Sequence, residues 1–154
     1  MGFSIREFHH QHRSRIIGEW VERLHTEVGE QYARRPVEEL EGTISEAFEA
    51  NFHVVVNQDF SYINEFIDKI TKMRLEAGFL LSDVQKAFEL YRIIVTPLLA
   101  SETGSQEFSE NIVKINQCLA YTIHRFSDHF QNMHEEEILK HNRRLEEDVR
   151  VRTA

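Results

Sequence analysis

The sequence predicts an all-α protein: a bundle of about five helices whose last helix extends from the bundle as a coiled coil. Two observations lead to this prediction. The 154 residues include only six glycines and two prolines, and no Asn-Gly, Asp-Gly or Gly-Gly dipeptide of the kind that closes a β-hairpin. Apolar residues recur every three or four positions through most of the chain, as they do on one face of an α-helix.

The first two helices are predicted from their N-terminal residues and from the apolar faces that follow. Ser4 and Glu7 have the spacing of a capping box, in which each side chain bonds a backbone N–H group of the first turn. Pro36 suits the first turn of the second helix, where its missing N–H group needs no partner. The apolar faces comprise Ile17, Trp20, Val21, Leu24 and Val28, and then Val37, Leu40, Ile44, Phe48, Phe52 and Val55.

The third and fourth helices are expected to meet at a sharp corner. Asp59 is the expected N-terminal cap of the third helix, and Gly78 is its expected end. Ser82 and Gln85 have the spacing of a second capping box, at the start of the fourth helix. The apolar faces comprise Phe60, Ile63, Ile67, Ile70 and Ala77, and then Val84, Ala87, Phe88, Tyr91, Ile94, Val95 and Leu98.

The last helix is predicted to be longer than the bundle. Pro97 removes one hydrogen bond from the fourth helix, so we expect a kink or an end just before it, followed by a loop at 101–106. From about Glu107 an unbroken helix to residue 154 would be about 70 Å long, and its far end must project from a domain of this size. Its apolar stripe comprises Phe108, Ile112, Ile115, Leu119, Ile123, Phe126, Phe130 and Met133.

After three glutamates at 135–137 the apolar spacing becomes that of a coiled coil. Ile138 and Leu145 fall at heptad position d, and Asn142 and Val149 fall at position a. A β-branched residue at a with leucine at d favours two parallel helices, and one Asn at a fixes their register. The alternative is a charged terminal helix that frays.

This change of spacing divides the chain into a helical input domain at 1–134 and a connector at 135–154. No glycine or proline ends the last helix, so we expect an output module to follow the connector in the same full-length chain. The closing residues are similar to the signalling-helix linkers that precede sensor or kinase modules in bacterial histidine kinases. The matching residues are Leu145, Glu146, Val149, Arg152, Thr153 and Ala154.

The segment 74–92, RLEAGFLLSDVQKAFELYR, predicts the tight corner between the third and fourth helices. Gly78 permits the turn, Phe79 can fill the gap between the helices, and Arg74 is placed to bind the last carbonyl groups of its own helix. A purely structural corner would account for all of these residues. The residues of the predicted corner are Arg74, Gly78, Phe79, Ser82, Asp83 and Val84.

The pattern Arg-x-x-x-Gly-Phe-x-x-Ser-Asp-Val at this corner resembles the N-terminal domain of RsbRD-type regulators, relatives of the stressosome RsbT co-antagonists. Trp20 upstream and the stretch DFSYINEFI at 59–67 belong to the same resemblance, which runs from about Ile16 to Leu99. It implies an all-helical, non-catalytic input domain placed ahead of output modules such as histidine kinases. It also implies a role related to that of the non-haem globin-like sensors of stressosomes. The family has no shared catalytic residue to transfer.

Composition excludes several other classes. Residues 36–133 hold seven Lys and Arg against fifteen Asp and Glu, which accounts for the whole net charge of −8 and disfavours binding to nucleic acid. A single cysteine fits a reducing cytoplasm. No apolar run approaches the roughly 18 residues of a membrane span, so no membrane insertion is expected.

Histidines and the cysteine are the remaining candidates for chemistry. Helical sensors of this size often have globin-like folds, so His53 and His124 are the candidates for a haem ligand, although neither lies squarely on the apolar face of its helix. His9 and His12 can share one helix face, but no third ligand is near them, and we expect an exposed surface rather than a metal site. Cys118 lies beside an apolar position, which predicts a buried thiol.

Together these patterns predict a cytoplasmic, non-catalytic sensor domain of a bacterial signal-transduction protein, such as a histidine kinase, that acts as a homodimer through its C-terminal helix. The sequence contains neither a Gly-x-Ser-x-Gly nucleophile motif nor a glycine loop for phosphate, and no cofactor is expected. Two alternatives stay open. One is a haem or small-ligand sensor, and the other is a stand-alone interaction module that presents its acidic face.

Overall fold

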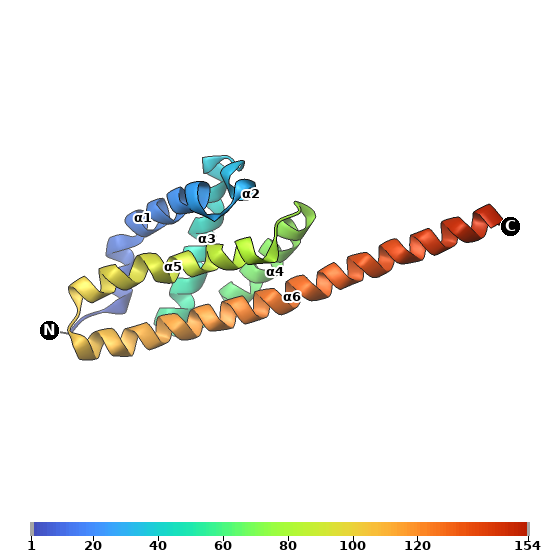
Figure 1. Cartoon of the computed structure of the whole chain (residues 1–154). Helices are drawn as coiled ribbons and strands as arrows, with labels where there is room; N and C mark the ends of the chain where they lie inside the picture. The colour runs from blue at the N-terminus through green and yellow to red at the C-terminus, as the bar shows by residue number, and fades with distance from the viewer. Residues whose placement is uncertain (1, 154) are drawn as a thin grey trace.

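A computed structural model of the chain has a helical body from which one helix projects (Figure 1). It describes residues 2–153, and the side chains of residues 2–151. All elements in that range are helical, so the all-α prediction is confirmed. The elements are α1 (Ile5–Arg23), the π-helical turn η1 (Leu24–Val28), α2 (Glu30–Ala33), α3 (Val37–Asn57), α4 (Ser61–Glu76), α5 (Leu81–Glu102) and α6 (Ser105–Thr153).

The helices of the body pack around one apolar core. In Figure 1, α5 lies between α1 and α6, while α3 and α4 cross this layer from behind. The indole N–H group of Trp20 donates a hydrogen bond to the carbonyl oxygen of Ala87, at 2.9 Å, and so joins α1 to α5 inside the core. No helix in the described part of the chain is both long enough and apolar enough to cross a membrane.

Local capping signals mark the starts of three helices. Ser4 accepts a hydrogen bond from the backbone N–H group of Glu7, at 3.2 Å, as its position before α1 predicts. Pro36 directly precedes α3. Asp59 accepts hydrogen bonds from the backbone N–H and the hydroxyl of Ser61, at 2.9 and 2.7 Å, and these bonds lower the pKa of the Asp59 carboxyl. The starts of the first three long helices therefore follow the predicted signals to within about a residue.

Two features of the connections differ from the prediction. The apolar face that begins in α1 continues through η1, after which Gly29 and the short helix α2 lead to α3. Helix α5 does not end before Pro97 but runs through it to Glu102. The expected loop at 101–106 is therefore only Thr103 and Gly104. Helix α5 is buried on both sides of the proline, at Ile94, Val95, Leu98 and Leu99, and this packing offsets the one missing hydrogen bond.

The first half of α6 closes the core. It packs against α3, α4 and α5, and Phe3 near the N-terminus donates its backbone N–H to Glu107 Oε2 at 3.0 Å. The predicted stripe is buried or half-buried as far as Met133. Cys118 is buried as expected, its thiol donates to Asn51 Oδ1 at 3.1 Å, and burial raises its pKa to about 12. The buried members of this half of α6 are Asn111, Ile115, Cys118, Leu119, Thr122, Phe126 and Phe130.

His9 is fully buried, so the expectation that it lies on an exposed surface is wrong. Its Nδ1 lies 2.8 Å from the carbonyl oxygen of Ile5, which can only accept, so Nδ1 carries the proton. Its Nε2 then accepts a hydrogen bond from the Tyr91 hydroxyl at 2.6 Å. Burial lowers the pKa of His9 to about 4. Helical spacing alone could not identify this buried pair, because its second member comes from α5.

The buried neutral His9 predicts a loss of stability in mild acid. The unfolded chain binds a proton at His9 below about pH 6.5, whereas the folded protein binds it only near pH 4. The free energy of unfolding should therefore be about 2 kcal/mol smaller at pH 5 than at pH 7 through this residue alone. Urea denaturation at the two pH values measures the difference. The variant His9→Gln has no such titration and should show a smaller difference, and equal differences in both proteins would contradict the assignment.

Candidate functional site

Arg74 is the most unusual residue of the corner, because its charged side chain is buried. The residue is 1% exposed, and its guanidinium carbon lies 5.2 Å from the ring centroid of Tyr32 and 4.7 Å from that of Phe79. The two rings contact each other edge to face, with centroids 4.8 Å apart. The sequence predicts that Arg74 binds the last carbonyl groups of its helix, but its side chain turns into the core instead. Arg74 therefore joins α2 to the corner by cation–π contacts.

A carboxylate from α3 completes the surroundings of Arg74. Glu39 Oε1 lies 3.7 Å from Arg74 Nη1, and Glu39 Oε2 lies 3.7 Å from Arg35 Nη1. The guanidinium of Arg35 also lies over the Phe79 ring, at 5.2 Å. Burial raises the pKa of Tyr32 to about 12, with the positive charge of Arg74 acting in the opposite direction. Glu39 thus stands between two arginines, and Tyr32 stays neutral beside them.

Only a small cavity lies beside Arg74 in the core. Arg74 Nε has no hydrogen-bond partner among the described residues. The cavity next to the residue has a volume of about 20 Å³, and aromatic residues such as Trp20, Phe66 and Phe88 form much of its wall. This volume suffices for a single water molecule and excludes a cofactor or a metabolite. The buried cluster of Arg74, Tyr32 and Phe79 therefore holds helices of the body together and is not a ligand pocket.

Gly78 ends α4 as predicted, through a Schellman motif. Its φ of 78° lies in the left-handed region that favours glycine. The backbone N–H of Phe79 donates to the carbonyl oxygen of Arg74 at 3.0 Å, and that of Gly78 donates to Leu75 at 3.1 Å. These two bonds satisfy carbonyl groups that would otherwise lack partners at the helix end. The same turn places the buried Phe79 ring against Arg74.

The predicted capping box of Ser82 and Gln85 is wrong. Helix α5 begins one residue earlier than Ser82, which lies exposed inside the first turn, and no side chain caps the helix. Gln85 instead donates from Nε2 to the hydroxyl of Ser127 on α6, at 2.8 Å. The Schellman turn leads directly into α5, and this leaves no extended residue at position 82 to act as a cap.

Two neighbouring residues at the start of α5, Asp83 and Val84, make different contacts. Val84 is buried in the core, as expected. The Asp83 carboxylate packs against Gly29, where an added Cβ would lie 2.7 Å from Asp83 Oδ2. Because the φ of Gly29 is 170°, its backbone is extended, and it is the close approach of Asp83 that favours glycine there. This contact packs the start of α5 against the connection between η1 and α2.

A groove separates the corner from α6 at the point where α6 leaves the body. The groove has a volume of about 650 Å³. It is lined by residues of the predicted corner and by residues of the predicted connector, two segments that lie far apart in the sequence. Leu80 at its rim is 64% exposed. We call this the corner groove. Its lining residues are Leu75, Gly78, Phe79, Leu80 and Leu81 from the corner, and Phe130, His134, Glu137, Ile138 and His141 from α6.

Beyond the body, α6 continues as an exposed helix. Every described side chain from residue 134 to residue 151 is exposed. Ile138, Leu145 and Val149 are 47, 50 and 59% exposed. Together with the exposed Asn142 they keep the predicted heptad spacing within continuous helix. Of the linker-like ending, the side chains of Arg152 and Thr153 and all of Ala154 lie outside the described residues.

The histidines that the sequence suggested as haem ligands lie at the surface of the body. His53 is half-buried and stacks on the Tyr62 ring, with ring centroids 3.9 Å apart, and His124 is exposed on α6. A haem ligand needs an apolar, enclosed setting, which neither position offers. His12 pairs with Glu102 through Nε2 at 2.6 Å. Among the described residues no cluster of three or more His, Cys, Asp or Glu side chains could hold a metal ion.

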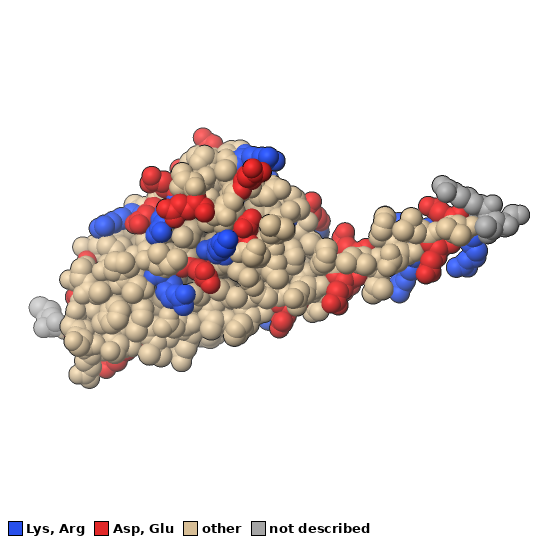
Figure 2. All heavy atoms as spheres, viewed as in Figure 1, with Lys and Arg blue, Asp and Glu red and all other residues tan. Residues whose placement is uncertain are grey.

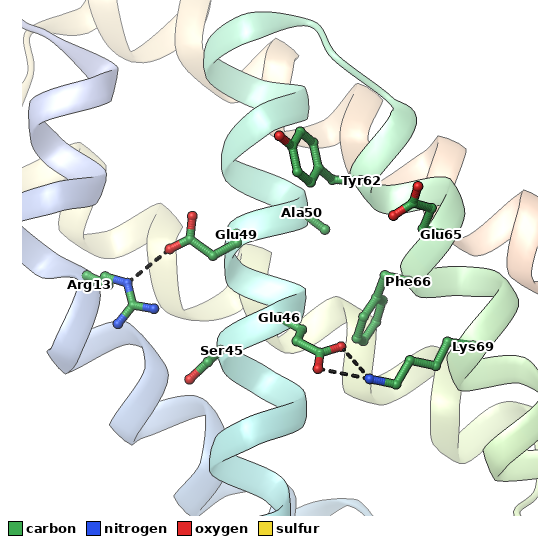
Figure 3. A pocket seen from close by; sticks show the side chains of 9 residues that line it. All are labelled: Arg13, Ser45, Glu46, Glu49, Ala50, Tyr62, Glu65, Phe66 and Lys69. Atoms are coloured by element: carbon green, nitrogen blue, oxygen red, sulfur yellow. Dashed lines mark hydrogen bonds and ion pairs between the residues drawn. The ribbon is translucent and has the colours of Figure 1, made fainter.

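A second groove lies between α1, α3 and α4 (Figure 3). It is open, with a volume of about 490 Å³, and both of its cationic side chains are paired with carboxylates. Arg13 Nε lies 3.1 Å from Glu49 Oε1, and Lys69 Nζ lies 2.9 Å from Glu46. Because each of these cations already has a carboxylate partner, the groove does not have the character of an anion site. Across the body, Figure 2 likewise shows acidic and basic side chains interspersed on the visible face.

Comparison of the chain with protein-family models, with curated proteins and with solved structures gave no match. The resemblance to the RsbRD-type domain therefore stays a prediction from the quoted residues. What the geometry defines is a helical body with a buried arginine at one corner and a groove between that corner and the exit of α6.

The environment of Arg74 predicts how the protein responds to its replacement. Arg74→Ala should lower the free energy of unfolding by about 3 kcal/mol, because Tyr32 and Phe79 lose their central contact and a void remains. Arg74→Met keeps most of the volume without a buried charge and should cost about half as much or less. Urea denaturation of the three proteins measures both effects. Equal losses in the two variants would show that the charge, rather than the packing, stabilises the corner.

Proposed function

We propose that this chain is a non-catalytic input domain of a bacterial signalling protein and that it acts through a pair of parallel α6 helices. The observation that carries the proposal is the exposed heptad stripe of Ile138, Asn142, Leu145 and Val149 on the projecting half of α6. In this proposal the body receives a signal, and the connector passes it to an output module in the same full-length protein.

The chemistry of the stripe favours pairing with a second copy. Full burial of a leucine, isoleucine or valine side chain is worth about 1.5–3 kcal/mol, and each chain offers three such residues along one seam. Asn142 opposite its counterpart can form a hydrogen bond across the seam, which favours the parallel, in-register arrangement. A seam of two heptads is short, so we expect a dimer of modest affinity that further contacts would strengthen.

The continuity of α6 supports a relay. One uninterrupted helix connects Phe130, buried in the body, to Val149 in the exposed stripe, over about 28 Å at 1.5 Å per residue. A helix transmits a shift or a rotation over this distance as a nearly rigid rod. A change in how the body packs on α6 therefore alters the geometry of the paired connectors and biases the output between two states.

The resemblances in the sequence support the identity of the output. The corner pattern from Arg74 to Val84 resembles RsbRD-type input domains, and the ending from Leu145 resembles the linkers of histidine kinases. A cytoplasmic sensor histidine kinase is the full-length protein that fits both resemblances. In that setting the chain itself needs no catalytic residue.

The oligomeric state of residues 1–154 tests the proposal. Light scattering over a concentration series should give a dimer for the unchanged protein and a monomer for Leu145→Asp, because a carboxylate at position d cannot be buried against its counterpart. Val151→Asp is the matched control, since Val151 is exposed on α6 but lies outside the stripe, and it should remain a dimer. A monomer at every concentration for the unchanged protein would refute the pairing.

A further inference from the structure

We infer that the corner groove is a second part of the dimer interface and that the partner subunit's Leu139 occupies it. This inference rests on the proposed pairing of α6, and it adds the place where one subunit touches the body of the other.

The heptad register determines which residues flank the seam. With Ile138 at d and Asn142 at a, Leu139 falls at position e, and His134 and His141 fall at position g. In a parallel pair, a residue at g lies beside the residue at e of the following heptad in the other helix. His134 therefore lies beside the partner subunit's Leu139.

The corner groove opens on the g side of α6. Its α6 wall includes both g residues, His134 and His141, together with the seam residue Ile138, but not Leu139. Leu139 thus lies on the other flank of its own helix, away from the groove of its own subunit. The two-fold symmetry of a parallel dimer carries this side chain across the seam to the groove of the partner.

The opposite wall of the corner groove has the apolar character that a leucine requires. Phe79, Leu80 and Leu81 line it, and Leu80 is 64% exposed. Leu139 is 54% exposed and lies outside the stripe, so pairing of the stripe alone would leave it in water. Seating the partner subunit's Leu139 against Leu80 buries both side chains, which the hydrophobic effect favours.

Charges at the rim fit the same arrangement. His141 at position g lies beside the partner subunit's Glu146 at position e, so a histidine meets a carboxylate rather than a like charge. Ile138 belongs both to the groove wall and to the seam, so the two parts of the interface are continuous. In this arrangement Leu80 contacts the partner subunit, while Phe79 contacts Arg74 in the buried cluster. The corner therefore links the core of the body directly to the paired connectors.

Cross-linking between two variants that each carry one added cysteine tests this inference. Leu80→Cys protein is mixed with Leu139→Cys protein, one of them carrying a size tag, and treated with a short bismaleimide. The native Cys118 is buried, so the unchanged protein should give no product and serves as the blank. Val149→Cys reports on the seam alone, because position a meets its counterpart directly. Leu80→Cys mixed with Val151→Cys is the matched control, since Val151 is exposed on the same helix outside the seam.

The inference predicts a cross-linked dimer for Val149→Cys and for the 80–139 mixture, with several-fold less product for the 80–151 mixture. Cross-linking of Val149→Cys without the 80–139 product would overturn the groove contact and leave the proposed pairing intact. Equal yields from the 80–139 and 80–151 mixtures would also overturn it, since they indicate random collision. Absence of the Val149→Cys product would overturn the parallel pairing and this inference with it. Circular dichroism of each variant confirms that its body is folded.

Discussion

Helix α6 lies in two different environments, because its first half packs against the body and its second half is exposed. The packing of the other helices depends on the first half. Its first half supplies the face against which α3, α4 and α5 pack, with Ile115, Phe126 and Phe130 inside the core. At 49 residues it is about 73 Å long, so the body cannot cover its second half. The core therefore ends along α6 near Phe130, and the later apolar residues of the helix, such as Leu145 and Val149, are exposed.

The corner between α4 and α5 lies where α6 changes from buried to exposed. Arg74 holds this corner to α2 and α3 through the rings of Tyr32 and Phe79 and the carboxylate of Glu39. Burying an arginine costs free energy unless its charge is compensated. Here the compensation comes from two aromatic rings and from the Glu39 carboxylate at 3.7 Å. The packing of this corner therefore depends on several helices at once.

Prediction from the sequence succeeded where the signal involves near neighbours in the chain. Ser4 caps α1 through Glu7, Pro36 precedes α3, and Gly78 ends α4, because each effect depends on residues within about one helical turn. It failed where a distant residue decided the outcome. Pro97 does not end α5, because neighbouring helices stabilise it, and Gln85 bonds to Ser127 on α6 rather than forming a cap.

The sequence by itself determined the fold class, the long last helix and the two groups of residues that form the corner and the heptad stripe. Periodicity and end signals are local properties, and they suffice for these features. Only the tertiary structure decided that His9 is buried on Tyr91, that Arg74 turns inward, and that the corner and the connector meet across one groove. Each of these depends on which helices pack together, and helical spacing shows that a face is apolar without showing what covers it.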